Sequence, residues 1–158
     1  MQLYVSANIK KEIDNLIDEC KLACNLWLEE YGFSSRVDSN GYWGYCPAND
    51  TIEIQIYEEP GDVATWNDFL YDHLHCISFY DIFITSFLHE LGHAHTIEFF
   101  DEHDWEVARS ALTPLDYFET PIEIAATHWA IDFMDNQKEE VDMLAELLRP
   151  AIEKIEKI

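Results

Sequence analysis

Basic residues are scarce in this chain of 158 residues. Lysine and arginine together number 9, against 32 aspartates and glutamates, so the formal net charge is −23 at pH 7. A surface of this sign repels nucleic acid and anionic membranes and attracts basic molecules. We therefore expect no nucleic-acid partner and no membrane partner, and we expect any protein or peptide substrate to be basic.

Cysteine and long apolar runs are also scarce. The four cysteines are Cys20, Cys24, Cys46 and Cys76. They form no C-x-x-C pair, which argues against a disulfide framework and against a zinc site made of thiolates. The N-terminus lacks a basic segment followed by an apolar one, and the most apolar run, 76–88, contains Asp81 and is too short to cross a bilayer. These features predict a cytoplasmic protein.

Apolar and aromatic residues, in contrast, are plentiful enough for a packed core. Hydrophobic residues make up 48% of the chain and aromatic residues 14%, which predicts a single domain over residues 1–158. Apolar residues at helical spacing predict a first helix over residues 9–28, with Asn8 as its N-cap and Gly32 as its stop.

The middle of the chain has the alternation that is typical of strands. Ile52, Ile54 and Ile56 alternate with polar residues, so residues 51–58 and the aromatic segment 42–46 are expected to pair as a small antiparallel hairpin. Residues 62–75 fit no single pattern.

The second half of the chain is expected to be helical. The predicted helices span residues 80–95, 122–134 and 141–155, and residues 99–112 are predicted to be a loop with a short helix. The first of these helices is apolar nearly all round in its first half and should lie at the centre of the domain. Thr113-Pro114 and Thr120-Pro121 are typical of helix starts, and Pro150 is expected to bend or interrupt the last helix. The predicted fold class is α+β.

The central helix carries the sequence His89-Glu90-Leu91-Gly92-His93. A helix turns about 100° per residue, so the two histidines lie on one face, one turn apart, and can bind the same metal ion. Glu90 points beside that ion, where it can take a proton from a water on the metal without being a ligand. Gly92 lowers helix propensity by about 1 kcal/mol relative to alanine. A glycine is favoured there if another backbone approaches closely.

A catalytic zinc site needs a third protein ligand and an open position for water. The candidates are Glu119, Glu123, His95, His103 and His128. Glu123 is favoured, because the small residues Ala126, Thr127 and Ala130 share its helix face. That face would let the helix pack closely against Gly92 and bring the carboxylate to the metal.

One observation keeps another ligand open. Thr120 and Glu123 match a capping box, in which the glutamate would cap its own helix instead. Glu119, one turn earlier, would then be the substitute ligand. His95 is expected to face away from the two motif histidines, because it lies about 160° around the helix axis from His93.

The run Phe87-Leu88-His89-Glu90-Leu91-Gly92-His93, followed by Glu123-x-x-Ala126-x-x-Trp129-Ala130, resembles the gluzincin pattern. It is most similar to the small ImmA/IrrE-like metallopeptidases associated with phage and mobile elements, and the resemblance covers residues 42–134. It implies a zincin-like minimal domain with an N-terminal helix, a small antiparallel sheet, a central motif helix and C-terminal helices. It also implies that residues 52–56 are the edge strand against which substrate lies.

The activity implied by this resemblance is that of a zinc-dependent endopeptidase. Zn²⁺ would be held by His89, His93 and Glu123, and a metal-activated water would hydrolyse the peptide bond with Glu90 as general base. Tyr117 and His128 are candidate donors to the oxyanion, and their spacing selects neither.

Two other functions compete with the peptidase. The charge favours a non-enzymatic acidic module on a zincin scaffold, which captures a basic protein or mimics nucleic acid. The second competing function is a structural metal site, in which His103 or His128 is the fourth ligand. Glu90 favours the enzyme, because a site that has lost its activity has no need of a general base.

Overall fold

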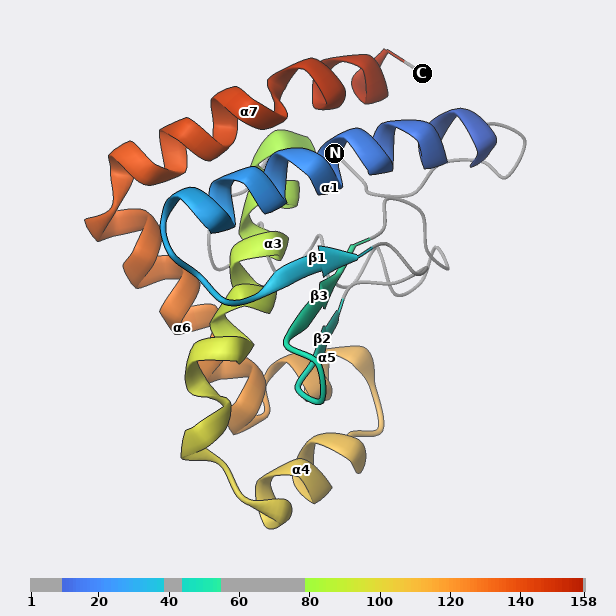
Figure 1. Cartoon of the computed structure of the whole chain (residues 1–158). Helices are drawn as coiled ribbons and strands as arrows, with labels where there is room; N and C mark the ends of the chain where they lie inside the picture. The colour runs from blue at the N-terminus through green and yellow to red at the C-terminus, as the bar shows by residue number, and fades with distance from the viewer. Residues whose placement is uncertain (1–9, 39–43, 55–78, 158) are drawn as a thin grey trace.

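The computed structural model describes residues 10–38, 44–54 and 79–157 (Figure 1). Its elements are α1 (Lys10–Glu30), β1 (Arg36–Asp38), β2 (Gly44–Cys46), β3 (Thr51–Glu53), α3 (Phe79–Thr96), the 3-10 helix η2 (Ile97–Phe99), α4 (Glu102–Arg109), α5 (Pro114–Phe118), α6 (Pro121–Asn136) and α7 (Lys138–Glu156). The described residues are mostly helical with one small sheet, which is consistent with the α+β class. The predictions made for Asn8, Ile56, 62–75 and Cys76 lie outside the described residues.

The first helix ends where its sequence predicts. Gly32 adopts φ +76°, a left-handed conformation that glycine takes without strain. The backbone N–H of Phe33 donates to the Leu28 carbonyl at 2.9 Å, and that of Gly32 donates to the Glu29 carbonyl at 3.2 Å. This pair of bonds is a Schellman motif, which satisfies carbonyls at the end of α1.

The core lies between α1, α3 and α7. Figure 1 shows α1 and α7 side by side, with α3 crossing beneath them. Every residue of α3 from Ile82 to His93 is buried, as its apolar first half predicts. Trp27 is fully buried, and its indole N–H donates to the Glu140 carbonyl at 2.8 Å, which fixes α1 against the start of α7.

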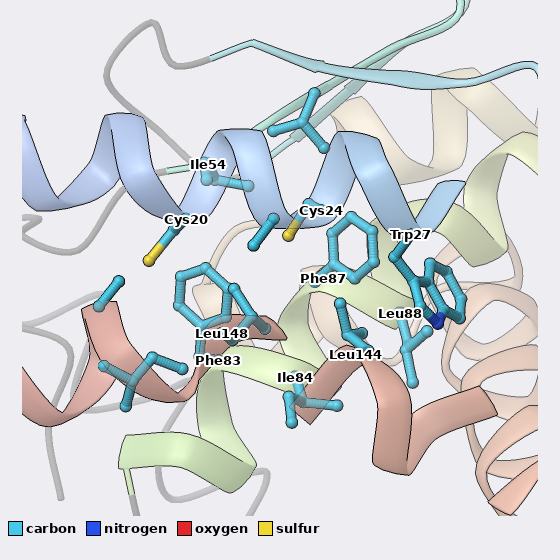
Figure 2. Packing of buried hydrophobic residues seen from close by; sticks show 14 of the residues in the cluster. Cys20, Cys24, Trp27, Ile54, Phe83, Ile84, Phe87, Leu88, Leu144 and Leu148 are labelled. Atoms are coloured by element: carbon cyan, nitrogen blue, oxygen red, sulfur yellow. The ribbon is translucent and has the colours of Figure 1, made fainter. Parts of the chain in front are cut away.

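Two cysteines belong to this core. Figure 2 shows Cys20 and Cys24 on α1, among apolar side chains of the core such as Phe83 and Phe87 of α3. Both thiols are free, and burial, together with the charge of Glu19, raises the pKa of Cys20 to about 12. At neutral pH these cysteines therefore act as small apolar residues.

The sheet differs from the predicted one in two ways. The expected hairpin forms, with β2 antiparallel to β3 and Tyr45 opposite Ile52, but β1 also pairs with β3 in parallel, with Val37 opposite Ile52. The sheet is therefore mixed rather than antiparallel, and its order is β1-β3-β2. The prediction of an edge strand is wrong for Thr51–Glu53, because this strand is paired on both sides. Glu53, expected on a polar face, is buried with its apolar neighbours.

Two helices of the second half, α5 and α6, begin at the predicted Thr-Pro pairs. Thr113 caps α5 and accepts a hydrogen bond from the backbone N–H of Asp116, and Pro121 is the first residue of α6. In contrast, α7 continues through Pro150 to Glu156, so the proline does not interrupt it. Buried residues lie on both sides of Pro150, and their packing outweighs the lost backbone hydrogen bond. Within the described ranges, no helix has the length and hydropathy needed to cross a membrane.

Candidate metal centre

Three side chains of α3 form a buried cluster. The potential ligand atoms of His89, Glu90 and His93 lie within 4.8 Å of one another. The two imidazole rings have centroids 4.8 Å apart and planes at 88°, as expected for residues one helical turn apart. A cluster of this composition and burial could hold a metal ion.

Helix α6 adds a second carboxylate from the opposite side. Glu123 Oε2 lies 3.0 Å from His89 Nε2 and 2.6 Å from His93 Nε2. The Glu123 side chain is only 5% exposed, so these contacts are shielded from water. The ligand atoms of Glu90 lie close enough to those of the histidines to form one cluster with them. Glu123 contacts both imidazole rings directly. The two carboxylates therefore meet the histidine pair in different ways.

The donor set fits zinc in type and nearly in spacing. Zinc prefers imidazole nitrogen and carboxylate oxygen at about 2.0–2.1 Å, which holds tetrahedral ligand atoms about 3.3 Å apart. The Glu123 contacts of 3.0 and 2.6 Å are shorter than this spacing by about 0.3 and about 0.7 Å. Small side-chain rotations would open the three atoms to that spacing.

A close helix crossing brings Glu123 to the histidines. A Cβ atom on Gly92 would lie 2.5 Å from the carbonyl oxygen of Ala126, closer than real Cβ contacts occur. Ala126, Thr127 and Ala130 are buried on the same face of α6. The prediction that Gly92 admits another backbone is thereby confirmed, and the backbone in question is that of α6.

The alternative capping box at Thr120 does not form. Thr120 makes no side-chain cap, and its hydroxyl instead donates to the Tyr117 carbonyl at 2.7 Å. The Glu123 carboxylate is turned to the histidines, where it compensates buried polar groups that would otherwise be costly. A capping box does form at the start of α4, between Asp101 and Asp104.

The other predicted ligands lie elsewhere. Glu119, His103 and His128 are exposed. His95 stacks on Trp129, with ring centroids 4.7 Å apart and planes at 4°, and so faces away from the cluster as predicted. Among the residues that the structure describes, the cluster of metal-ligating groups includes none of these four.

Electrostatics of the centre follow from a buried carboxylate between two imidazoles. Burial alone would raise the pKa of Glu123, but the hydrogen bonds and charges of His89 and His93 hold it well below its usual range. Burial alone would lower the pKa of His93, but the hydrogen bond with Glu123 and the charges of Glu123 and Glu90 raise it. Without a metal, the Glu123 carboxylate thus lies between two imidazoles, and the one whose pKa it raises is that of His93.

Two polar neighbours complete the centre. Thr127 Oγ1 lies 3.0 Å from His89 Nδ1, a contact that the sequence interpretation missed although Thr127 follows Glu123 by one helical turn. The Tyr117 hydroxyl is hydrogen-bonded to Glu123, and burial, together with the charges of Glu123 and Glu90, raises the pKa of Tyr117. Tyr117 is itself 41% exposed, but its hydroxyl reaches Glu123. His128, the other candidate oxyanion donor, is an exposed residue of α6.

Comparisons with protein-family models, curated proteins and solved structures return no match for this chain. The chemistry of the centre therefore rests on its own residues. Two imidazoles and a carboxylate face one point, a second carboxylate lies beside them, and a phenol contacts the first carboxylate.

Proposed function

We propose that this chain is a zinc-dependent endopeptidase similar to the small ImmA/IrrE-like gluzincins. One observation carries the proposal: Nε2 of His89, Nε2 of His93 and Oε2 of Glu123 converge from two helices in a buried place. Two histidines and a glutamate are the ligand set of gluzincin-type catalytic zinc sites, in which water takes the fourth position. Glu90 belongs to the same cluster, and because the other three residues supply the ligands, it would act without binding the metal.

The chemistry divides between the metal and the side chains around it. Zinc held by His89, His93 and Glu123 would polarise the scissile carbonyl and lower the pKa of a water towards about 7. Glu90 takes the proton from the attacking water as its oxygen bonds to the carbonyl carbon. The same carboxyl group then delivers this proton to the nitrogen of the leaving amine as the C–N bond breaks.

Tyr117 is the favoured donor to the oxyanion. Its raised pKa keeps the hydroxyl protonated at neutral pH, and its contact with Glu123 holds it beside the centre. Once Glu123 binds the metal, the hydroxyl can turn to the carbonyl oxygen on which negative charge develops.

The substrate we propose is a basic protein or peptide, and the compartment is the cytoplasm. The net charge of −23 attracts cationic chains, and Arg109, a basic residue of α4, is already paired with Glu102 and Glu106. Three free thiols among the described residues suit a reducing environment.

The test compares the wild type with Glu90→Gln on peptides rich in lysine and arginine. We expect Glu90→Gln to slow cleavage by about 10²–10⁴-fold, because the general base is lost. Elemental analysis should still find about one zinc per chain, because glutamine at this position removes no ligand. The double variant His89→Ala, His93→Ala is the control and should lose both zinc and cleavage. Undiminished cleavage by Glu90→Gln would rule out the proposed mechanism.

The net charge also favours a second candidate, an acidic module that captures a basic protein without cleaving it. The same variant separates the two candidates. An acidic module would keep its biological activity in Glu90→Gln, whereas a peptidase would lose it and retain only substrate binding.

A further inference from the structure

Both ring nitrogens of His89 are held by side chains of α6. Thr127 Oγ1 lies 3.0 Å from Nδ1, and Glu123 Oε2 lies 3.0 Å from Nε2. The two α6 residues are one helical turn apart and share a face. All three residues are at most 7% exposed, so water has little access to these contacts. One helix therefore supplies a partner to each side of the imidazole.

A neutral imidazole carries one proton, on either nitrogen. When Nε2 is protonated it donates to the Glu123 carboxylate, and Nδ1 then needs a donor. When a metal occupies the Nε2 lone pair, the proton must lie on Nδ1, which then needs an acceptor. A carboxylate or a backbone carbonyl can only accept, whereas a threonine hydroxyl can rotate and do either.

We propose that Thr127 is a positioning residue that serves both tautomers of His89. In the metal-free chain its O–H donates to Nδ1, and Nε2–H donates to Glu123. When Nε2 binds a metal, the ring keeps one proton, which moves from Nε2 to Nδ1 by exchange with water, and Thr127 accepts from Nδ1–H. The second half of this inference rests on the metal binding of the proposed function, and neither half requires peptidase activity.

The competing explanation is that Thr127 is only a small residue in the tight crossing of α3 and α6. Ala126 and Ala130 fill that role on the same face without a polar atom. Thr127 differs because its oxygen is at hydrogen-bond distance from Nδ1. Valine has nearly the same shape as threonine and lacks the hydroxyl, so Thr127→Val separates packing from hydrogen bonding.

The experiment measures zinc affinity and the His89 tautomer in the full chain. Affinity is measured by competition with a chromophoric chelator, and the tautomer by long-range ¹H–¹⁵N NMR of the ring, with and without zinc. Thr127→Val should weaken zinc binding by about 10–100-fold, the usual effect of losing a partner of a metal-bound histidine. Thr127→Ser, which keeps the hydroxyl, should stay close to the wild type. Wild-type His89 should change from Nε2–H to Nδ1–H when zinc is added.

Thr85→Val is the matched control. Thr85 is also a buried threonine between α3 and α6, and its hydroxyl lies 3.9 Å from the sulfur of Met134. This variant should leave both zinc affinity and the His89 tautomer unchanged.

Three results would overturn the inference. The first is wild-type zinc affinity in Thr127→Val, and the second is an equal loss of affinity in Thr127→Ser. The third is an Nδ1–H tautomer of His89 in the metal-free wild type. A wild type that takes up no zinc would refute the proposed function, and the metal-free spectra would still decide whether Thr127 donates to Nδ1.

Discussion

At the scale of the residue, Asp50 shows how one carboxylate joins separate segments. It accepts hydrogen bonds from the hydroxyls of Ser34, Ser35 and Tyr45 at 2.5, 2.6 and 2.7 Å. Burial would raise the pKa of Asp50, but these three bonds and the charge of His95 lower it. Asp50 thereby ties the β2–β3 hairpin to the segment that follows α1.

This network predicts an acid-sensitive contribution to stability. Because the folded-state pKa of Asp50 lies below the unfolded value, its contribution is present above that value and disappears as pH falls through the folded pKa, below about 3.9. Asp50→Asn tolerates the observed φ of 52° and removes the charge. It should lower the free energy of unfolding at pH 7 by about 1 kcal/mol, a value reduced for partial exposure to water.

Urea unfolding at pH 7 and at pH 3 measures this effect. The difference between Asp50→Asn and the wild type should shrink at the lower pH. A constant difference would show that the charge of Asp50 contributes nothing and that the asparagine disturbs packing instead.

At the scale of the element, the crossing of α3 and α6 decides whether the centre can form. Gly92→Ala places a methyl group against the Ala126 carbonyl, and backbone atoms cannot move aside as a flexible side chain can. Overpacking of this kind costs about 1–3 kcal/mol. The better helix propensity of alanine offsets about 1 kcal/mol of it. We expect lower stability and a clear loss of zinc affinity, because Glu123 moves away from the histidines.

Gly32→Ala is the matched comparison, because the same chemical change meets open space there. Its positive φ makes alanine unfavourable by about 1–2 kcal/mol. Thermal unfolding should therefore show a loss of stability in both variants, and chelator competition should show weaker zinc binding in Gly92→Ala alone. Equal zinc affinity in the two variants would mean that the crossing does not control the centre.

Helices and strands could be predicted from the sequence where neighbouring residues determine them, and not where they depend on residues far away in the chain. The helices follow from apolar spacing and from the Thr-Pro pairs at which α5 and α6 begin. The strand β1 has three residues and one buried apolar side chain, Val37, so no alternation reveals it. β3 is the central strand only because β1 pairs with it, so its place in the sheet could not be predicted without β1.

The same limit applies to the centre. His89, Glu90 and His93 come together through helical geometry alone, so five residues of sequence suffice to group them. Glu123 is thirty positions beyond His93, and the small residues of its helix face, which pack against Gly92, favour it over Glu119. The Thr127 contact needs the depth and rotation of α6 against α3, which sequence spacing does not specify.

At the scale of the whole molecule, the charge imbalance should dominate the response to salt. Lys21, Arg109, Arg149 and Lys154 already form ion pairs with acidic partners, and the large excess of carboxylates remains. These carboxylates repel one another over distances that salt screens, with a Debye length of about 10 Å at 0.1 M and about 3 Å at 1 M.

Stability should therefore rise with ionic strength. We expect the Tm from circular dichroism to increase by a few degrees between low salt and about 0.5 M NaCl, because self-repulsion in the folded state is screened. The internal control is a pH near 4, where about half of the carboxylates are protonated and the salt effect should shrink. A Tm that falls with salt at pH 7 would mean that the ion pairs outweigh the repulsion.

The contact between Gly92 and Ala126 has a consequence for how the centre tolerates change elsewhere. At this point the backbone of α3 lies directly against the backbone of α6. The distance between the two helices therefore has a lower limit that side-chain movements cannot change. Loosening the packing of α1 or α7 should therefore cost stability before it alters the distance between Glu123 and the histidines. Substitutions in α1 and α7 can therefore accumulate without changing the geometry of the centre, as long as the chain stays folded.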